Sequence, residues 1–298
     1  MGVTVTTTTT RLAGLQRTLA ARLVPLAWAN LVANILIVVT GGAVRLTGSG
    51  LGCPTWPKCT DESYTAHGAL GIHGVIEFGN RLLTYVLLAI ALAFVVAAWQ
   101  RAGRVRTLGL VVLAGIPAQA VVGGITVLTD LNPWVVAGHL LVSMAMVGVC
   151  VWILDELTGP TRPDASAVST RLAWVTFAVG WVVLWLGTVV TGSGPHSGDL
   201  DSRRTGLDPA TVSHIHGYSV WLLVVLTIAL ALVARRRGDH RLAMFAGVLL
   251  VVELAQGLLG YVQYFTDLPE ILVGLHMLGA AVIAAGIARV VVTTRARG

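Results

Sequence analysis

Residues 82–98 read LLTYVLLAIALAFVVAA, and this stretch decides the fold class. It carries no charge, and its apolar residues run continuously instead of alternating with the period of two that is typical of a strand. A chain in lipid must satisfy its backbone hydrogen bonds internally, which leaves helices or closed barrels. With the residues before it, the stretch is long enough to cross a hydrocarbon core of about 30 Å. We therefore expect a membrane-spanning helix over 71–98.

Seven further stretches have the same character, and the composition of the whole chain agrees. Charged residues make up 11% of the 298 residues and hydrophobic residues 55%, and the mean hydropathy is +0.81. A soluble domain has about 25% charged residues. The sequence thus predicts an all-α integral membrane protein with eight transmembrane helices, at 25–45, 71–98, 107–128, 135–155, 171–192, 210–234, 241–264 and 271–292.

Positive charge gathers in alternate loops. One side of the predicted membrane carries most of the arginines, within 11–22, 101–106, 162–171, 235–241 and 289–297. The loops of the other side hold only Arg45, Lys58, Arg203 and Arg204. Because an excess of Lys and Arg marks the cytoplasmic side, we expect both termini in the cytoplasm and the loops near 46–70 and 193–209 outside. The default location is a bacterial plasma membrane, and the basic pI of about 9.8 does not indicate nucleic acid.

The second half of the chain repeats the first. The repeated residues are offset by 137 positions, Gln119, Gly123, Asp130 and His139 recurring as Gln256, Gly260, Asp267 and His276. The motif Thr-Gly-Ser-Gly at 47–50 also recurs, at 191–194. An even number of spans in each unit makes the repeats parallel. We expect two pseudo-symmetric four-helix bundles, with the segments divided as leader 1–24, first bundle 25–157, cytoplasmic linker 158–170, second bundle 171–292 and tail 293–298.

Three histidines lie inside predicted spans, where an ionisable side chain is costly and is therefore a functional candidate. His139 and His276 are related by the repeat, and His216 lies in the sixth span. Imidazole is a common axial ligand of heme iron, and helical bundles hold cofactors between facing helices. From the residues alone these histidines are either heme ligands or groups that satisfy a local hydrogen bond or serve a proton path.

The second span carries a polar cluster. His73, Glu77 and Asn80 are spaced by four and three residues, which places them on one helical face, and Arg81 follows directly. A glutamate in a low-dielectric site suits proton transfer, and an arginine suits a heme propionate. The alternative is a buried Glu77–Arg81 ion pair that only fixes helix packing.

The two outward loops hold further candidates. Cys53 and Cys59 lie six positions apart in the first loop, where an oxidising exterior favours a disulfide. Such a pair is either a loop staple or redox-active. His196, in the second loop, either helps to close a cofactor pocket or is solvated. His214 is expected to point away from the helical face that carries His216.

With these motifs the chain resembles the heme A synthase family over nearly its whole length. The resemblance rests on TGSGLGCPTWPKC at 47–59, EFGNR at 77–81, TGSGPHSGD at 191–199 and the histidines His139, His216 and His276. It implies eight spans in two similar bundles and conversion of heme O to heme A, by oxidation of the C8 methyl group to a formyl group through successive hydroxylations. Heme A serves terminal oxidases, so heme O synthase and oxidase assembly are implied as partners, besides an electron donor that the sequence does not name.

The resemblance also implies roles for single residues. His216 and His276 look like the axial ligands of a heme b cofactor in the second bundle, and His139 looks like a histidine of the first bundle, where substrate heme would sit. Glu77 looks like the essential glutamate of the family. Cys53 and Cys59 look like its outward-loop cysteine pair.

One departure concerns the second span, where the family commonly has Glu-x-x-His-Arg and this chain has Asn80 in place of the histidine. Asparagine is a poor iron ligand, so we expect His139 alone to hold the first-bundle heme. His73 lies about 10 Å away along the helix and would substitute only if the heme shifted. Two other readings stay open: a di-heme b-type cytochrome that moves electrons between quinone and a partner, and a transporter with parallel repeats and no heme.

Overall fold

The computed structural model describes residues 14, 18–101, 103–199 and 201–297. Within them lie eight long helices: α2 (Leu23–Leu46), α3 (Gly71–Ala98), α4 (Arg104–Leu128), α5 (Pro133–Thr158), α6 (Ala167–Ser193), α7 (Pro209–Arg236), α8 (His240–Phe265) and α9 (Glu270–Thr293). A 3-10 helix, η1 (Gly68–Leu70), precedes α3. All eight helices are long and apolar enough to cross a membrane. The all-α fold class and its eight predicted spans are therefore confirmed, whereas most of the expected leader lies outside the described residues.

Capping residues set several helix starts. Asn132 and Ser166 accept the backbone N–H groups of Trp134 and Ser169, so α5 and α6 begin immediately after them. The Ser166 cap starts α6 inside the expected linker, which leaves only 159–166 to connect the two halves. Asp208 caps α7, and the hydrogen bonds that it accepts from Thr211 lower the pKa of its carboxyl group below the usual value.

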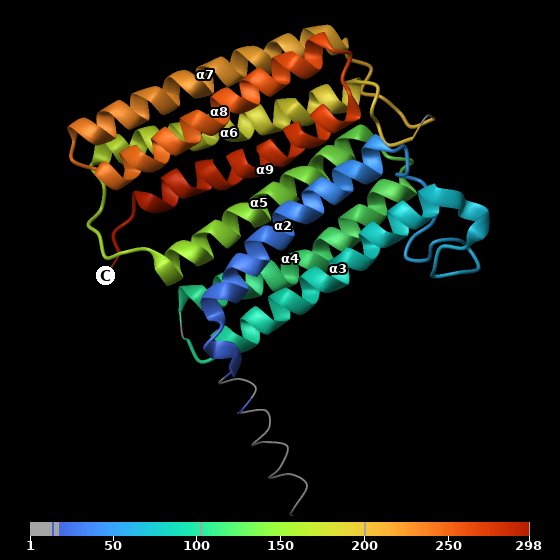
Figure 1. Ribbon diagram of the computed structural model, residues 1–298, viewed down its shortest axis with the longest axis horizontal. Helices are drawn as coiled ribbons and strands as arrows, with labels where there is room; N and C mark the ends of the chain where they lie inside the picture. Colours follow the sequence, from blue (N-terminus) through green and yellow to red (C-terminus); the bar gives the residue numbers. More distant parts are fainter. Residues whose placement is uncertain (1–13, 15–17, 102, 200, 298) are drawn as a thin grey trace, which may run out of the picture.

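The helices form two groups of four, α2–α5 and α6–α9, which lie side by side with both outward loops at one end (Figure 1). Helices α2, α5 and α9 meet at the centre, and α6 packs against both α5 and α9. At the centre, Gly42 of α2 lies against the end of the Met277 side chain of α9, where a Cβ on the glycine would lie 2.8 Å from the sulfur and would displace it.

Local structure recurs at the offset of the sequence repeat. The turn before α5 and the turn before α9 each contain two residues with positive φ, namely Asp130 (51°), Leu131 (55°), Asp267 (58°) and Leu268 (56°). Positive φ is uncommon for residues other than glycine, and here it occurs at all four positions. The same sequence features therefore produce the same unusual turns in both halves.

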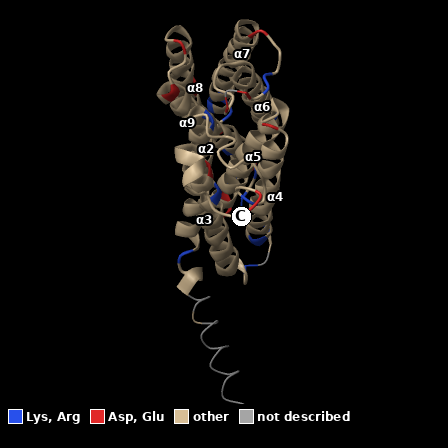
Figure 2. Ribbon diagram, turned by 90° about the vertical axis from the view of Figure 1, so that its right-hand side faces the viewer, with Lys and Arg blue, Asp and Glu red and all other residues tan. Residues whose placement is uncertain are grey.

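Charged residues are sparse over most of the ribbon (Figure 2). At the end opposite the outward loops, the buried carboxylate of Asp155 pairs with Arg162 at 2.6 Å and with Arg289 at 2.9 Å. The segment after α5 also pairs with the chain end through an isolated bridge between Arg162 and Arg297. These contacts hold the ends of α5 and α9 and the connecting segment together at this end of the molecule.

Candidate functional site

A cavity of about 430 Å³ lies among the helices of the second group and is also bordered by α5. His216 from α7 and His276 from α9 both line it. Each ring packs against a glycine of the preceding helix: a Cβ on Gly187 would lie 3.3 Å from His216 Cε1, and one on Gly260 would lie 3.4 Å from His276 Cε1. Larger residues at these glycines would press on the rings, so the glycines leave room for two imidazoles beside one cavity.

A glutamine positions His276. Gln256 Nε2 donates to the His276 carbonyl at 2.8 Å and lies 3.3 Å from the ring Nδ1. A Cβ on Gly279 would lie 2.0 Å from Gln256 Oε1, so only glycine permits this arrangement. The repeat-related Gln119 donates in the same way to the carbonyl of His139, also at 2.8 Å.

Two further ionisable residues line the second-group cavity. His214 also lines the cavity but, unlike His216, is exposed, and its ring lies 6.3 Å from that of Tyr264. Glu253 is buried, and its Oε1 accepts a hydrogen bond from Thr227 at 2.9 Å.

In the first group, His139 of α5 faces Gly123 of α4, where a Cβ would lie 3.3 Å from the ring Cε1. Its Nδ1 atom is buried and has no partner among the described residues. Asn80 of α3 lies opposite Gly41 of α2, where a Cβ would lie 4.0 Å from its Nδ2, and its buried Oδ1 is likewise without a described partner.

Asn80 therefore takes part in a pattern that runs through the four consecutive helix pairs. In α4/α5, α6/α7 and α8/α9 a histidine of the second helix faces a glycine of the first, and in α2/α3 the facing residue is Asn80. Sequence reasoning placed Asn80 on the polar face of the second span, and the resemblance marked it as the position of a family histidine. The four glycines that face these side chains were not recognised, although Gly123 and Gly260 belong to the repeat.

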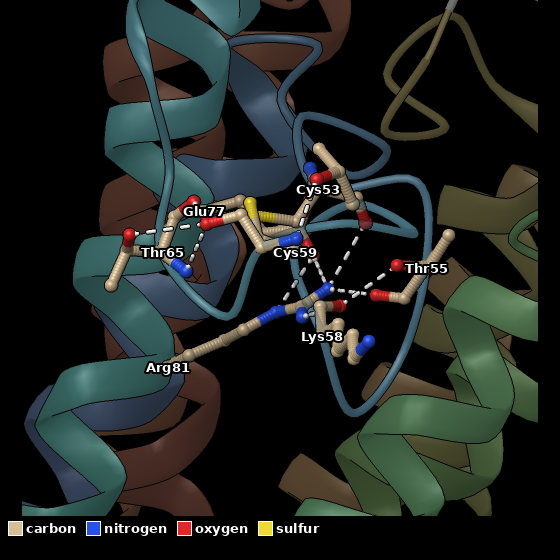
Figure 3. Close-up of a disulfide and its surroundings, with 9 residues drawn as sticks. Cys53, Thr55, Lys58, Cys59, Thr65, Glu77 and Arg81 are labelled. Atoms are coloured by element: carbon tan, nitrogen blue, oxygen red, sulfur yellow. Dashed lines mark hydrogen bonds and ion pairs between the residues drawn. A yellow bond between two sulfur atoms is a disulfide. The ribbon is translucent and has the colours of Figure 1, made fainter.

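Glu77 and Arg81 form an ion pair at 2.6 Å, which the sequence analysis left as an alternative, and Glu77 is buried. Both also contact the first outward loop (Figure 3). Glu77 Oε2 accepts the Cys53 N–H at 2.6 Å, and Arg81 donates to the loop carbonyls of Cys53, Thr55 and Lys58 at 3.0–3.1 Å. The pair thus fixes the loop on α3, and the Arg81 guanidinium is turned toward the carbonyls of the loop.

The predicted disulfide between Cys53 and Cys59 is present. The loop that it closes reaches over the first helix group, where Trp56 packs against Gly124 so tightly that a Cβ there would lie 2.3 Å from the indole. Gly124 directly follows Gly123, the residue that faces His139. Trp56 of the disulfide loop therefore packs on α4 beside the glycine that faces His139.

The other two candidate histidines, His73 and His196, line an outer cavity of about 690 Å³ between the loops. His73 Nδ1 is 2.9 Å from Ser49 Oγ. His196 Nε2 is 2.9 Å from the Leu268 carbonyl. In this structure both serve contacts between the outward loops and the helix ends.

Comparison with known proteins now adds to this geometry. The sequence matches the COX15-CtaA family, described as cytochrome oxidase assembly protein, over residues 25–69 and 71–195. The chain belongs to this family. It is a multi-pass membrane protein. The matched range includes the disulfide loop, Glu77, Asn80 and His139, whereas His216 and His276 lie beyond it.

Similar curated proteins carry the name heme A synthase. That of Lysinibacillus sphaericus is 30% identical over 53% of this chain and 54% of its own length, and that of Staphylococcus haemolyticus is 29% identical over 55% and 58%. The protein from Rhizorhabdus wittichii is 27% identical over 78% of this chain and 83% of its own. The chain thus spans little more than half the length of the first two relatives and most of the third.

Proposed function

We propose that this protein is a heme A synthase, which oxidises the C8 methyl group of heme O to a formyl group by successive hydroxylations. The observation that carries the proposal is the pair His216 and His276, which reach one cavity from different helices of a protein in this family. The name of the similar curated proteins supports it.

The residues of the second-group cavity fit a heme b cofactor. Its volume of about 430 Å³ lies within the range of roughly 300–1,000 Å³ for small-molecule sites. His216 and His276 would hold its iron, since both rings have room beside their facing glycines. A bis-histidine heme supplies one-electron transfer when bound.

The first helix group is the proposed site of the substrate. His139 would hold the iron of heme O, because its Nδ1 is buried and unpaired within the described part of the chain. Asn80 occupies the facing position on α3 and offers an amide, a poor iron ligand. Holding of the iron by a single histidine suits a substrate that must be released after oxidation.

Glu77 is the proposed catalytic carboxylate. Oxidation of a methyl to a formyl group removes protons from the reacting carbon, and a positioned carboxylate is suited to accept them. The Cys53 N–H and the Arg81 guanidinium hold its two oxygens in place. The disulfide loop and Trp56 would limit the access of water to this region from outside.

The cellular setting follows from the same proposal. Arginine-rich loops support a plasma-membrane topology with both termini in the cytoplasm. Heme O would come from a heme O synthase, and heme A would pass to the assembly of a terminal oxidase.

The decisive experiment is to purify the protein from membranes supplied with heme O and to identify the extracted hemes by mass. Heme b together with a hydroxylated form or heme A supports the proposal. Heme b alone, at two per chain, favours the di-heme cytochrome. The presence of histidines in both helix groups is consistent with that alternative. The absence of any heme favours the transporter.

A further inference from the structure

Arg45, at the outer end of α2, lines the same cavity as His216 and His276. Its side chain crosses from the first half of the chain to the second: Nε donates to the His196 carbonyl at 2.5 Å and Nη2 to the Thr191 carbonyl at 2.9 Å. Arg45 is therefore an element of the second-group site, although it belongs to the first sequence repeat.

No carboxylate compensates the charge of Arg45 within the described part of the chain. Its two hydrogen-bond acceptors are neutral carbonyls, and none of the ion pairs formed by described residues includes it. Asp199, Asp201 and Glu270 line the outer cavity on its other side without pairing with it. A cation taken partly out of water without a counter-charge is costly, so a ligand that brings an anionic group to the cavity would be stabilised here.

Arg81 differs from Arg45 in its hydrogen bonding. All three guanidinium nitrogens of Arg81 are engaged, by Glu77 and by the carbonyls of the disulfide loop. Arg45 Nη1 has no hydrogen bond to any described residue and remains able to donate. Arg45 is thus the better placed of these two arginines for a ligand carboxylate.

The depth of the two histidines relative to Arg45 suits a ligand of one chemical class. His216 lies seven residues after the start of α7 and His276 six residues after the start of α9, which places them about 9–11 Å below the outer helix ends. Arg45 lies in the last turn of α2, at that outer end. Heme b carries its two propionate carboxylates on one edge of the ring, away from the iron, and therefore presents an iron and carboxylates in this order.

We propose that Arg45 binds a carboxylate of the porphyrin held in the second-group cavity, and so fixes which edge of the ring faces outward. This inference rests on the proposed heme b site. Arg45 is a positioning residue for the cofactor, and through its bonds to the second outward loop it makes that site depend on both halves of the chain.

The test is a binding titration of the full-length apoprotein, purified in detergent from a heme-deficient host. The two probes are heme b and its dimethyl ester, in which both carboxylates are blocked, and the readout is the absorbance change on binding. Wild-type protein is expected to bind the free acid roughly 10-fold to 100-fold more tightly than the ester, since hydrogen bonds to charged groups have this strength. Arg45→Gln should lose that preference by weakening only the binding of the free acid.

Two variants serve as controls. Arg203→Gln removes an exposed cation from the same outer loop, and Arg203 lines neither cavity, so this variant should keep the preference. His216→Ala should weaken both ligands about equally, since it removes an iron ligand and not a carboxylate partner.

The titration distinguishes failure of the proposed role of Arg45 from failure of the proposed heme site. Equal binding of acid and ester by the wild-type protein overturns the role of Arg45 while leaving the heme site intact, and it needs no variant. A preference that survives in Arg45→Gln overturns the role as well. If the wild-type protein binds neither probe, the proposed heme site itself fails, and the role of Arg45 fails with it.

Discussion

Replacement of Glu77 by Gln tests the proposed chemistry with the smallest change of shape. Glu77 accepts hydrogen bonds on both sides, from the Cys53 N–H at Oε2 and from Arg81 at Oε1. A glutamine has only one carbonyl oxygen, so whichever way the amide is turned, its NH₂ group faces a donor. The variant must lose one of these two contacts.

The magnitude follows from the partner that is lost. A hydrogen bond to a charged group contributes about 1.5–3 kcal/mol, so we expect Glu77→Gln to lower the free energy of unfolding by about that amount. Arg81 keeps its three loop carbonyls, which limits the loss. The fold should persist, heme A and its hydroxylated precursors should be absent, and the heme b spectrum of the other bundle should be unchanged.

The assay combines the mass of the extracted hemes, the heme b spectrum and the half-life of the folded protein at a fixed elevated temperature. Glu253→Gln is the matched control for stability: Glu253 Oε1 accepts from Thr227 and Oε2 has no partner among the described residues, so an amide fits without two donors facing each other. Normal heme A production by Glu77→Gln would refute the catalytic role. An unchanged stability would refute the analysis of its hydrogen bonds.

Three other predictions concern the helix ends, the cofactor and the disulfide loop. Asp155→Asn leaves two buried arginine contacts uncompensated and should lower the free energy of unfolding by about 3–5 kcal/mol, whereas Glu156→Gln breaks only an exposed pair worth about 0–1 kcal/mol. Similar thermal stabilities of these two variants in detergent would contradict a stabilising role for the buried ion pairs of Asp155. His276→Ala should remove the heme b absorption from the purified protein, and an unchanged spectrum would refute its assignment as a ligand. Gly124→Ala should expel Trp56 from its contact with α4. The measurement is tryptophan fluorescence, which should shift to the red and be quenched more strongly, and the difference between wild type and Trp56→Phe gives the contribution of Trp56 to the spectrum. If that contribution is the same in Gly124→Ala as in the wild-type protein, the packing of Trp56 on Gly124 is wrong.

The sequence alone determined the number and type of the helices and the position of the disulfide. A membrane span is a local property, because length and hydropathy fix it without reference to the rest of the chain. The eight spans therefore agree with the structure to within a few residues, and the largest difference, at the start of α6, comes from the side-chain cap of Ser166. The pairing of Cys53 with Cys59 was also accessible, since the two lie in one short loop.

Only the tertiary structure decided what the polar side chains contact. The sequence shows that Arg81 follows Asn80 in the second span. The direction of its guanidinium, however, depends on where the disulfide loop folds back onto α3. The alignment of Asn80 with three histidines appears only when each is seen against the glycine that faces it. In the same way, Arg45 reaches the second-group cavity because α2 packs beside α9 at the centre of the molecule. Contacts between residues far apart in the chain depend on how the helices are rotated and packed, and hydropathy carries no information about either.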